Sequence, residues 1–196
     1  GVVLAYNGEV YNFRSLRVLL EASGHRFRSG GDTEVLLRAY LEWGIGCLNR
    51  LCGMFAFAIW DPRSGTVHLA RDALGMKPLY VMKTGQGVTF ASEVKAFRSL
   101  PSYERRLDPL GLAQYLEFGY VPDSHRTSLE GISKLAPGER WELTEGRVTR
   151  RVQWYQPPVP DSAGKRSEEE RVDELRQTLA QVVTEHLVAD VPVGLL

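Results

Sequence analysis

Seven consecutive apolar residues at positions 54–60 most constrain what this chain can fold into. The run includes Phe55, Phe57 and Trp60, and the turn-forming sequence Asp61-Pro62-Arg63-Ser64-Gly65 follows it directly. Aromatic residues ahead of a turn favour a β-strand over a helix. The apolar residues at 67–70 then predict the returning strand of a hairpin. We therefore expect a buried strand that pairs with its neighbour in the sequence.

Two helices are predicted ahead of this hairpin. Asn12 can serve as the N-cap of a helix that ends at about Ser23, before Gly24. Asp32 can cap a second helix that extends from Thr33 to about Trp43. The residues expected on the buried faces of these helices are Leu16, Leu19, Leu20, Val35, Leu36, Ala39 and Tyr40.

A second hairpin is predicted after the first. Residues 79–82 and 88–91 form two apolar segments on either side of Gly85-Gln86-Gly87. Antiparallel strands that follow two helices indicate helices packed on sheet layers. The pattern therefore predicts a mixed α/β (α+β) domain.

Residues 107–154 continue with one more helix and further strands. We expect a helix over 107–118, which the sequence Gly119-Tyr120-Val121-Pro122 ends. Its apolar residues are Leu110, Leu112, Tyr115 and Leu116. Strands are expected over 132–135, 140–143 and 147–154, separated by Pro137-Gly138 and Glu145-Gly146.

The C-terminal segment has a different character. Proline, glycine and polar residues over 157–164 are typical of a linker. Ser167 and Glu170 form a capping-box pattern at the start of a helix that extends to about Leu187. The residues expected on its inward face are Val172, Leu175, Leu179, Val182 and Val183. An apolar strand is predicted over 191–196, where the sequence stops without a turn or partner, as a cut chain would.

Charge and composition argue against several classes of protein. Lys+Arg and Asp+Glu are equal at 24 each, so no global attraction to nucleic acid or an anionic membrane is expected. No run of about 18 apolar residues occurs, so no membrane span is expected. Cys47 and Cys52 are the only cysteines, which fits a reducing, cytoplasmic compartment. Their spacing, without a His or Cys partner, predicts no metal site.

The residues Asn7-Gly8-Glu9 carry the chemistry that points most clearly to a function. They follow a short apolar strand expected at 2–4, and present an amide, a bare backbone N–H and a carboxylate in succession. An amide and a backbone N–H together can stabilise an oxyanion, and a carboxylate beside them can hold an ammonium group. A site that cleaves the amide of a small amino acid needs this set. The alternative is a plain Asn-Gly turn.

Ordered blocks along the chain resemble the glutamine-hydrolysing asparagine synthetase family, through its class II glutamine amidotransferase domain. Together they extend over nearly the whole chain, and their order is more specific than any one block. The blocks are Tyr6-Asn7-Gly8-Glu9-Val10-Tyr11-Asn12, Gly31-Asp32-Thr33-Glu34, Gly53-Met54-Phe55-Ala56-Phe57, Arg71-Asp72-Ala73-Leu74-Gly75-Met76-Lys77-Pro78-Leu79-Tyr80, Ala91-Ser92-Glu93-Val94-Lys95-Ala96, Phe118-Gly119-Tyr120-Val121-Pro122, Lys134-Leu135-Ala136-Pro137-Gly138 and Asp190-Val191-Pro192-Val193-Gly194.

The resemblance implies a four-layer αββα N-terminal-nucleophile hydrolase fold. It implies that residues 1–157 form the glutaminase domain without its N-terminus and that 158–164 form a linker. Residues 165–196 would then be the first helix and strand of an α/β ATP-pyrophosphatase domain. Gly1 lies inside the family pattern, so the nucleophilic cysteine is expected upstream of this sequence. The fragment alone is therefore expected to be inactive.

The resemblance also implies a reaction. In the family, a cysteine thiolate attacks the glutamine carboxamide, and ammonia passes through an internal tunnel to a second domain. There ATP, with Mg²⁺, adenylates aspartate, and ammonia displaces AMP to give asparagine. Glutamine, aspartate and ATP are thus the expected ligands of the whole protein, with no cofactor or metal inside this fragment. A homodimer is expected on the same ground.

The resemblance gives four residues a role in the site. The Asn7 side-chain amide and the Gly8 N–H would form the oxyanion hole. Glu9 and Asp32 would bind the α-amino group of glutamine, since charge-assisted hydrogen bonds to two carboxylates suit that cation. Without the resemblance, Asp32 is a helix cap and Glu9 a solvated turn carboxylate; for Asp32 the two roles can coexist.

Other polar residues have structural interpretations. Cys47 and Cys52 are expected to be packing residues, because neither has a free α-amine or a nearby histidine as base. Arg71 and Asp72 are expected to form a structural turn in which the two side chains pair and support the site indirectly. The four histidines, for which no catalytic role is expected, are His25, His68, His125 and His186.

Two rival functions remain open from the sequence. The first is an amidotransferase of the same layout that transfers ammonia to an acceptor other than aspartate, because the acceptor pocket would lie beyond Leu196. The second is a non-catalytic relative used for assembly or regulation. The intact set of Asn7, Gly8, Glu9 and Asp32 argues against the second.

Overall fold

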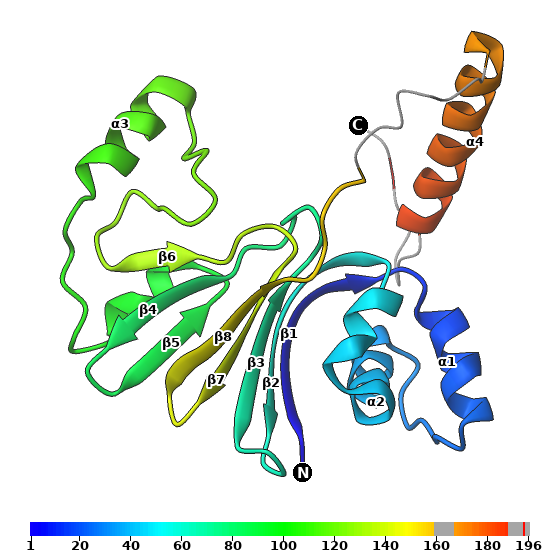
Figure 1. Ribbon diagram of the computed structural model, residues 1–196, viewed down its shortest axis with the longest axis horizontal. Coiled ribbons are helices and arrows are strands. Elements are labelled where there is room, and N and C mark those ends of the chain that lie inside the picture. The colour runs from blue at the N-terminus through cyan, green and yellow to red at the C-terminus, as the bar shows by residue number, and fades with distance from the viewer. Residues whose placement is uncertain (159–166, 188–193, 195–196) are drawn as a thin grey trace.

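The computed structural model describes residues 1–158, 167–187 and 194 (Figure 1). The strands are β1 (Val3–Val10), β2 (Gly53–Asp61), β3 (Thr66–Arg71), β4 (Tyr80–Thr84), β5 (Gly87–Ala91), β6 (Ile132–Lys134), β7 (Glu139–Thr144) and β8 (Arg147–Gln153). The helices are α1 (Phe13–Ala22), α2 (Asp32–Trp43), α3 (Pro109–Phe118) and α4 (Glu168–His186), with the short 3₁₀ helices η1 (Gly44–Arg50) and η2 (Val94–Ser99). The two predicted hairpins are confirmed.

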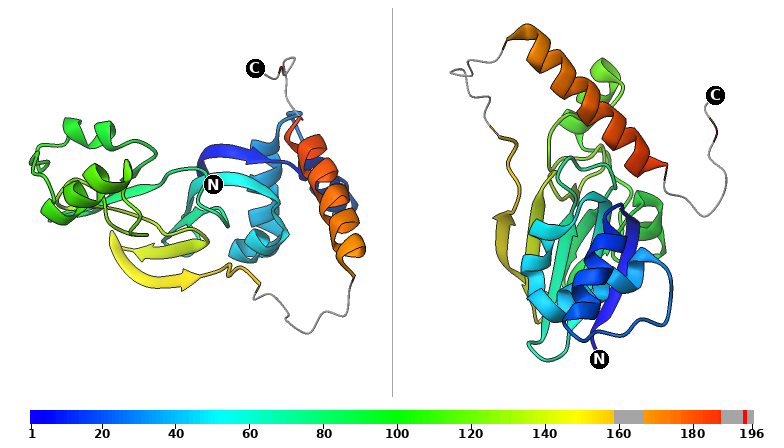
Figure 2. Two further views of the ribbon diagram at one scale, coloured as in Figure 1. Left: turned by 90° about the horizontal axis from the view of Figure 1, so that it is seen from above. Right: turned by 90° about the vertical axis from the view of Figure 1, so that its right-hand side faces the viewer.

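The strands form two antiparallel sheets. A five-stranded sheet has the order β1-β2-β3-β7-β8, and a three-stranded sheet has the order β5-β4-β6. Viewed from above, α1 and α2 lie at one end of the molecule, the strands lie in the middle, and η2 and α3 lie at the other end (Figure 2). β1 is an edge strand of the described sheet, which matters for the site.

β2 is buried on both faces, and its residue sizes alternate to suit the two sides. Phe55, Phe57 and Ile59 pack in the cluster on the helix side. Ala56 and Ala58 pack in the cluster between the two sheets. Successive side chains of a strand point to opposite faces, so one face carries large residues and the other carries alanine. The small residues let the second sheet approach closely.

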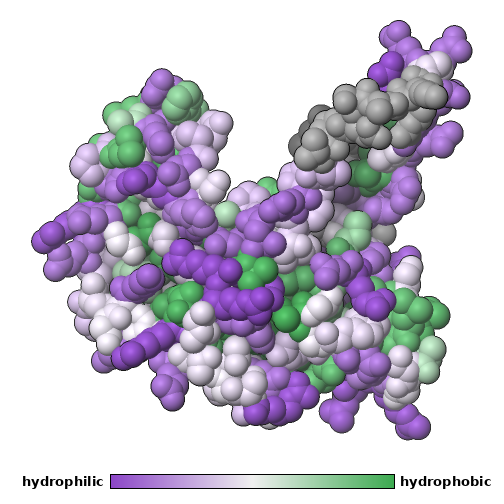
Figure 3. Space-filling model, viewed as in Figure 1, coloured by the Kyte–Doolittle hydropathy of each residue, from purple (hydrophilic) through white to green (hydrophobic). Residues whose placement is uncertain are grey.

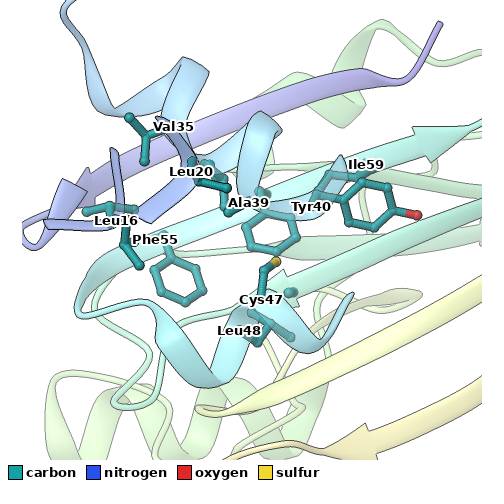
Figure 4. Packing of buried hydrophobic residues seen from close by; sticks show 13 residues of the cluster. Leu16, Leu20, Val35, Ala39, Tyr40, Cys47, Leu48, Phe55 and Ile59 are labelled. Atoms are coloured by element: carbon teal, nitrogen blue, oxygen red, sulfur yellow. The ribbon is translucent and has the colours of Figure 1, made fainter. Parts of the chain in front are cut away.

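The helix-side cluster joins α1, α2 and η1 to the five-stranded sheet (Figure 4). The predicted inward residues are buried, with one exception: Leu19 is 51% exposed. Leu16 and Leu20 are one helical turn apart and define the buried face of α1, so Leu19 falls at its border.

The outer face of the three-stranded sheet is covered by η2. Phe97 of η2 is fully buried against Met82 and Ile132. The arrangement is therefore helices, sheet, sheet and helix, as the predicted αββα fold requires. The fourth layer is thin, because a 3₁₀ helix takes the place of a long α-helix.

α3 begins at Pro109 rather than at Leu107. Asp108 is its N-cap and accepts a hydrogen bond from the Gly111 N–H at 2.6 Å, and proline fits the first helical position. Of its apolar residues, Leu110, Tyr115 and Leu116 are exposed. Figure 3 shows apolar residues at the surface of this projecting part of the molecule.

α4 shows the predicted capping box. Ser167 accepts from the Glu170 N–H, and the Glu170 carboxylate accepts from the Ser167 N–H. The apolar residues expected to point inward are instead exposed; they are Val172, Leu175, Leu179, Val182 and Val183. Nearly all of the predicted linker and strand lies outside the described residues. None of the helices in the described part combines the length and apolar character that a membrane crossing needs.

Candidate functional site

Asn7, Gly8 and Glu9 lie inside β1, so the prediction that the strand ends before them is wrong. β1 pairs with β2 without interruption, from Val3 opposite Trp60 to Val10 opposite Gly53. An Asn-Gly pair makes a tight turn only when its two flanks pair with each other. Here both flanks pair with the same neighbouring strand, so the turn alternative is also wrong.

Gly8 is required by close packing between β1 and β2. A Cβ atom at this position would lie 2.2 Å from the Met54 carbonyl oxygen and 2.7 Å from the Phe55 Cα. Both are backbone atoms, which cannot turn aside as a flexible side chain can. Glycine therefore lets the strand pass and leaves the backbone N–H of this position unobstructed.

The Gly8 N–H is directed to the open edge of β1. Opposite Gly8 in the ladder, Phe55 accepts from the Asp72 N–H at 2.8 Å and donates to the Asp72 carboxylate at 3.2 Å. Phe55 thus uses both backbone groups on its far side. In an antiparallel ladder, paired residues turn their polar groups either toward each other or both away. Gly8 therefore points away from β2, as does the Val10 N–H, which bonds to Asp32 at 2.9 Å.

The Asn7 side chain points to the face between the two sheets, since neighbouring residues of a strand alternate. It lines a cavity of about 230 Å³ with Ala5 and Ala58 of the five-stranded sheet and Phe90 and Ser92 beyond it. No hydrogen bond of the Asn7 amide occurs among the described residues. Adjacent residues thus direct an amide group and a backbone N–H to one corner of the molecule, a pairing that can stabilise an oxyanion.

Asp32 is not the N-cap of α2, so that expectation is wrong. The N-cap is Gly31, and Asp32 is the first helical residue. Its Oδ2 accepts from the Tyr6 hydroxyl at 2.7 Å and from the Val10 N–H at 2.9 Å. The carboxylate therefore faces the open edge of β1, toward which the Gly8 N–H also points.

Glu9 is exposed, and its side chain points to the face of β1 opposite to that of Tyr6. Its charge affects Tyr6 and Tyr11. Burial is the largest cause that raises the pKa of Tyr6, followed by the hydrogen bond and charge of Asp32 and then by Glu9. Burial and then Glu9 also raise the pKa of Tyr11. Two carboxylates thus lie near Tyr6, an arrangement that attracts a cation.

Arg71 and Asp72 do not form the expected ion pair with each other. The Arg71 guanidinium donates to the carbonyl oxygens of Gly75, Lys77 and Leu135 at 2.6 to 2.8 Å. The Asp72 carboxylate accepts from four backbone N–H groups, those of Phe55, Leu74, Met76 and Lys77. The pair is structural, and through Phe55 it supports the strand that faces Gly8.

Neither cysteine of the chain is an activated nucleophile. Cys47 is fully buried in the helix-side cluster, and burial raises the pKa of its thiol to about 12 (Figure 4). Cys52 is exposed, but its Sγ lies 3.9 Å from a Glu185 carboxylate oxygen, and partial burial with that charge raises its pKa. A raised pKa keeps a thiol protonated and unreactive. Cys47 is therefore a packing residue as expected, whereas the expectation that Cys52 packs in the interior is wrong.

Asn12 stands at the N-cap position of α1 as predicted, but its side chain bonds elsewhere. Its Nδ2 donates to the Arg50 carbonyl at 2.8 Å and its Oδ1 accepts from the Cys52 N–H at 3.0 Å, with no cap bond to α1. It ties the end of β1 to the start of β2. Within residues 1–158, 167–187 and 194, no group of three or more His, Cys, Asp or Glu residues could hold a metal ion.

Comparison with known proteins identifies the class of this domain. Residues 1–155 match the family described as the glutamine amidotransferase domain. The chain belongs to this family.

Its relatives include glutamine-hydrolysing asparagine synthetases. Asparagine synthetase 3 of Bacillus subtilis strain 168 is 35% identical over 97% of this chain and 30% of its own length. Asparagine synthetase 2 of Arabidopsis thaliana is 32% identical over the whole chain and 28% of its own length. The chain thus spans about 30% of the length of these relatives.

A solved structure has the same fold. Glutamine phosphoribosylpyrophosphate amidotransferase from B. subtilis, complexed with ADP and GMP, matches with a TM-score of 0.57 and 23% sequence identity. The match covers 81% of this chain and 30% of that chain. It supports the N-terminal-nucleophile hydrolase fold expected from the sequence.

Proposed function

We propose that this domain binds glutamine at the open edge of β1 and hydrolyses its side-chain amide to glutamate and ammonia. The observation that carries the proposal is the register of β1 on β2. It turns the Gly8 N–H to the open edge while Asn7 reaches the adjacent cavity. Family membership supports glutamine as the substrate.

The Asn7 and Gly8 donors assist the slow step of amide hydrolysis, which is the addition of a nucleophile to the carbonyl carbon. A nucleophile adds to the carboxamide carbon, and the carbonyl π electrons move to the oxygen. The Asn7 amide and the Gly8 N–H stabilise that oxyanion, each contributing about 3 kcal/mol. The C–N bond then breaks, a proton is transferred to the departing nitrogen, and ammonia leaves. Water cleaves the acyl intermediate, which releases glutamate and restores the nucleophile.

The nucleophile in this proposal is a cysteine outside the 196 residues. Cys47 is buried, and the Cys52 thiol lies beside a carboxylate, so neither offers a thiolate. Asn7 and Gly8 therefore stabilise the oxyanion that forms when a cysteine from another part of the protein attacks the glutamine carboxamide.

Glu9 and Asp32 hold the α-ammonium group of glutamine. Glu9 lies in β1 and Asp32 in α2, the charges of both act on Tyr6, and the Gly8 N–H lies on the edge that Asp32 faces. Charge-assisted hydrogen bonds to two carboxylates select a cation and fix its direction. This places the side-chain amide of the bound amino acid toward Asn7.

The named relatives support asparagine as the product of the whole protein. In that protein, ammonia would react with aspartate activated by ATP, and Mg²⁺ would accompany the nucleotide. The chain spans about 30% of the relatives' length. We assign ATP, Mg²⁺ and aspartate to the part that it does not span.

The full-length protein tests the proposal when it is supplied with glutamine, ATP, Mg²⁺ and aspartate, with glutamate and asparagine measured together. Equal formation of both is the expected result. Formation of glutamate without asparagine would support glutamine hydrolysis and indicate that ammonia is transferred to an acceptor other than aspartate. Absence of glutamate would contradict the proposal.

A further inference from the structure

Tyr6 is a part of the site that the sequence did not reveal. It precedes Asn7 in β1 and lies 26 positions from Asp32, yet its hydroxyl donates to the Asp32 Oδ2 at 2.7 Å. The side chain packs against the helix-side cluster, between β1 and the start of α2. The bond therefore joins the two elements that carry the oxyanion donors and the cation-binding carboxylate.

The two donors to Asp32 share one oxygen. Oδ2 accepts from both the Tyr6 hydroxyl and the Val10 N–H, at 2.7 and 2.9 Å. The nearest partner of Oδ1 is the Thr33 hydroxyl at 3.4 Å, which is beyond the usual O–H···O distance. One oxygen is thus fixed by the protein, and the other remains able to accept from a ligand.

The hydroxyl of Tyr6 is a reliable donor. Burial, the bond to Asp32 and the two carboxylates all raise the pKa of Tyr6, so the phenol stays protonated at physiological pH. Its ring is held by packing, so the direction of the O–H is fixed before any ligand binds. Because Tyr6 holds the Asp32 carboxylate in place beforehand, less conformational entropy of this side chain is lost when a ligand binds.

We propose that Tyr6 is a positioning residue that fixes Asp32 so that Oδ1, which has only the long contact to Thr33, receives the α-ammonium group of glutamine. Tyr6 thereby sets the preference for the amino acid over an analogue without the amino group. The inference rests on the proposed function, and it adds a residue and a selectivity to it.

The test uses Tyr6→Phe in the full-length protein, which removes the hydroxyl and keeps the ring. Initial rates are measured with glutamine and with glutaramate, which is glutamine without its α-amino group. The KM for glutamine should rise about tenfold, the effect of losing one hydrogen bond to a charged group. kcat should stay within about twofold, because the ammonium contact is the same in the ground and transition states. The kinetics of glutaramate should not change.

Tyr40→Phe is the matched control. The Tyr40 hydroxyl also donates to an aspartate, Asp61, at 3.1 Å in the same helix-side cluster but away from the β1 edge. Tyr40→Phe should destabilise the protein about as much as Tyr6→Phe does and leave the KM for glutamine unchanged. In an Asp32→Asn background, Tyr6→Phe should add no further loss, because its effect passes through Asp32.

Three outcomes would overturn the inference. An unchanged glutamine KM in Tyr6→Phe would show that Tyr6 does not position Asp32. An equal loss for glutamine and glutaramate would show a general structural role. A wild-type protein that releases no glutamate would overturn the proposed function, and this inference with it, before any variant is compared.

Discussion

Asp32 and Asp72 both accept backbone N–H groups near β1, and they differ in how much of each carboxylate the protein itself uses. Asp72 is 1% exposed, and four N–H groups occupy its two oxygens. Asp32 has both of its short bonds on Oδ2, and the nearest partner of its Oδ1 is the Thr33 hydroxyl at 3.4 Å. A carboxylate that the fold saturates holds a turn, whereas one with an oxygen left over can hold a ligand. In this molecule the difference distinguishes the acid that holds a turn from the acid that we assign to the ligand.

The largest effect is expected from the saturated acid. Asp72→Ala would leave four backbone N–H groups without their acceptor, which should lower the free energy of unfolding by about 4 kcal/mol. Denaturant unfolding of the full-length protein measures it. At a temperature where the variant remains folded, its glutamine KM should change less than that of Asp32→Ala. A rise in the glutamine KM of Asp72→Ala as large as that of Asp32→Ala would contradict the distinction between the two acids.

A loss of turnover is expected from the oxyanion donor. Asn7→Ala should lower the kcat of glutamine hydrolysis by about 10² or more, while glutamine binding persists. Asn12→Ala is the control, because that residue only ties Arg50 and Cys52 together. It should reduce stability and spare kcat. Normal turnover in Asn7→Ala would remove Asn7 from the oxyanion hole.

Asp32→Ala should affect glutamine binding more than Asp72→Ala does and stability less, because two donors rather than four lose their acceptor. The KM for glutamine should rise by at least tenfold, since a charge-assisted hydrogen bond is lost, while ammonia-dependent synthesis persists. Glu34→Ala is the control from the same turn of α2, because its carboxylate holds the N–H groups of Arg28 and Ser29. Unchanged glutamine kinetics in Asp32→Ala would contradict the role given to this residue.

The smallest effect concerns a third acid, Asp61, which is saturated like Asp72. Hydrogen bonds from Arg63 are the largest cause that lowers its pKa from 3.8. The unfolded chain then binds a proton more readily than the folded one, so stability falls as pH falls through the acid range below about 4. Asp61→Asn should remove this loss and lower Tm at pH 7 by about 3 °C. Thermal unfolding at a series of pH values measures the Tm at pH 7 and its decrease below about pH 4. The same decrease in Asp61→Asn as in the wild type would contradict the account.

Much of the fold could be predicted because its signals are local. The apolar run in β2, the two hairpin turns and the Ser167 capping box each depend on a few neighbouring residues. Failures occurred where the outcome depends on distant partners. Asn-Gly is a turn signal in isolation, but continuous pairing with β2 keeps it inside a strand. Asp32 resembles a helix cap in the sequence. Only its hydrogen bonds from Tyr6 and Val10, which are distant in the chain, show that its carboxylate faces β1.

The expected inward face of α4 was wrong for a related reason. This helix carries apolar residues at helical spacing, which predicts an apolar face but cannot say what covers it. The Asn7, Gly8, Glu9 and Asp32 set was found from the sequence by resemblance, and its geometry came from the register. Tyr6 has no sequence signal, because a tyrosine in a strand is ordinary until its partner is known.

Amide hydrogen exchange at Gly8 tests the central claim most directly. In the full-length protein without ligand, the Gly8 N–H should exchange faster than those of Asn7 and Glu9, which face β2 in the ladder. Saturating glutamine should slow Gly8 strongly, because the N–H then donates to the carboxamide oxygen. A Gly8 N–H as protected as its neighbours without ligand, and unchanged by glutamine, would contradict the account.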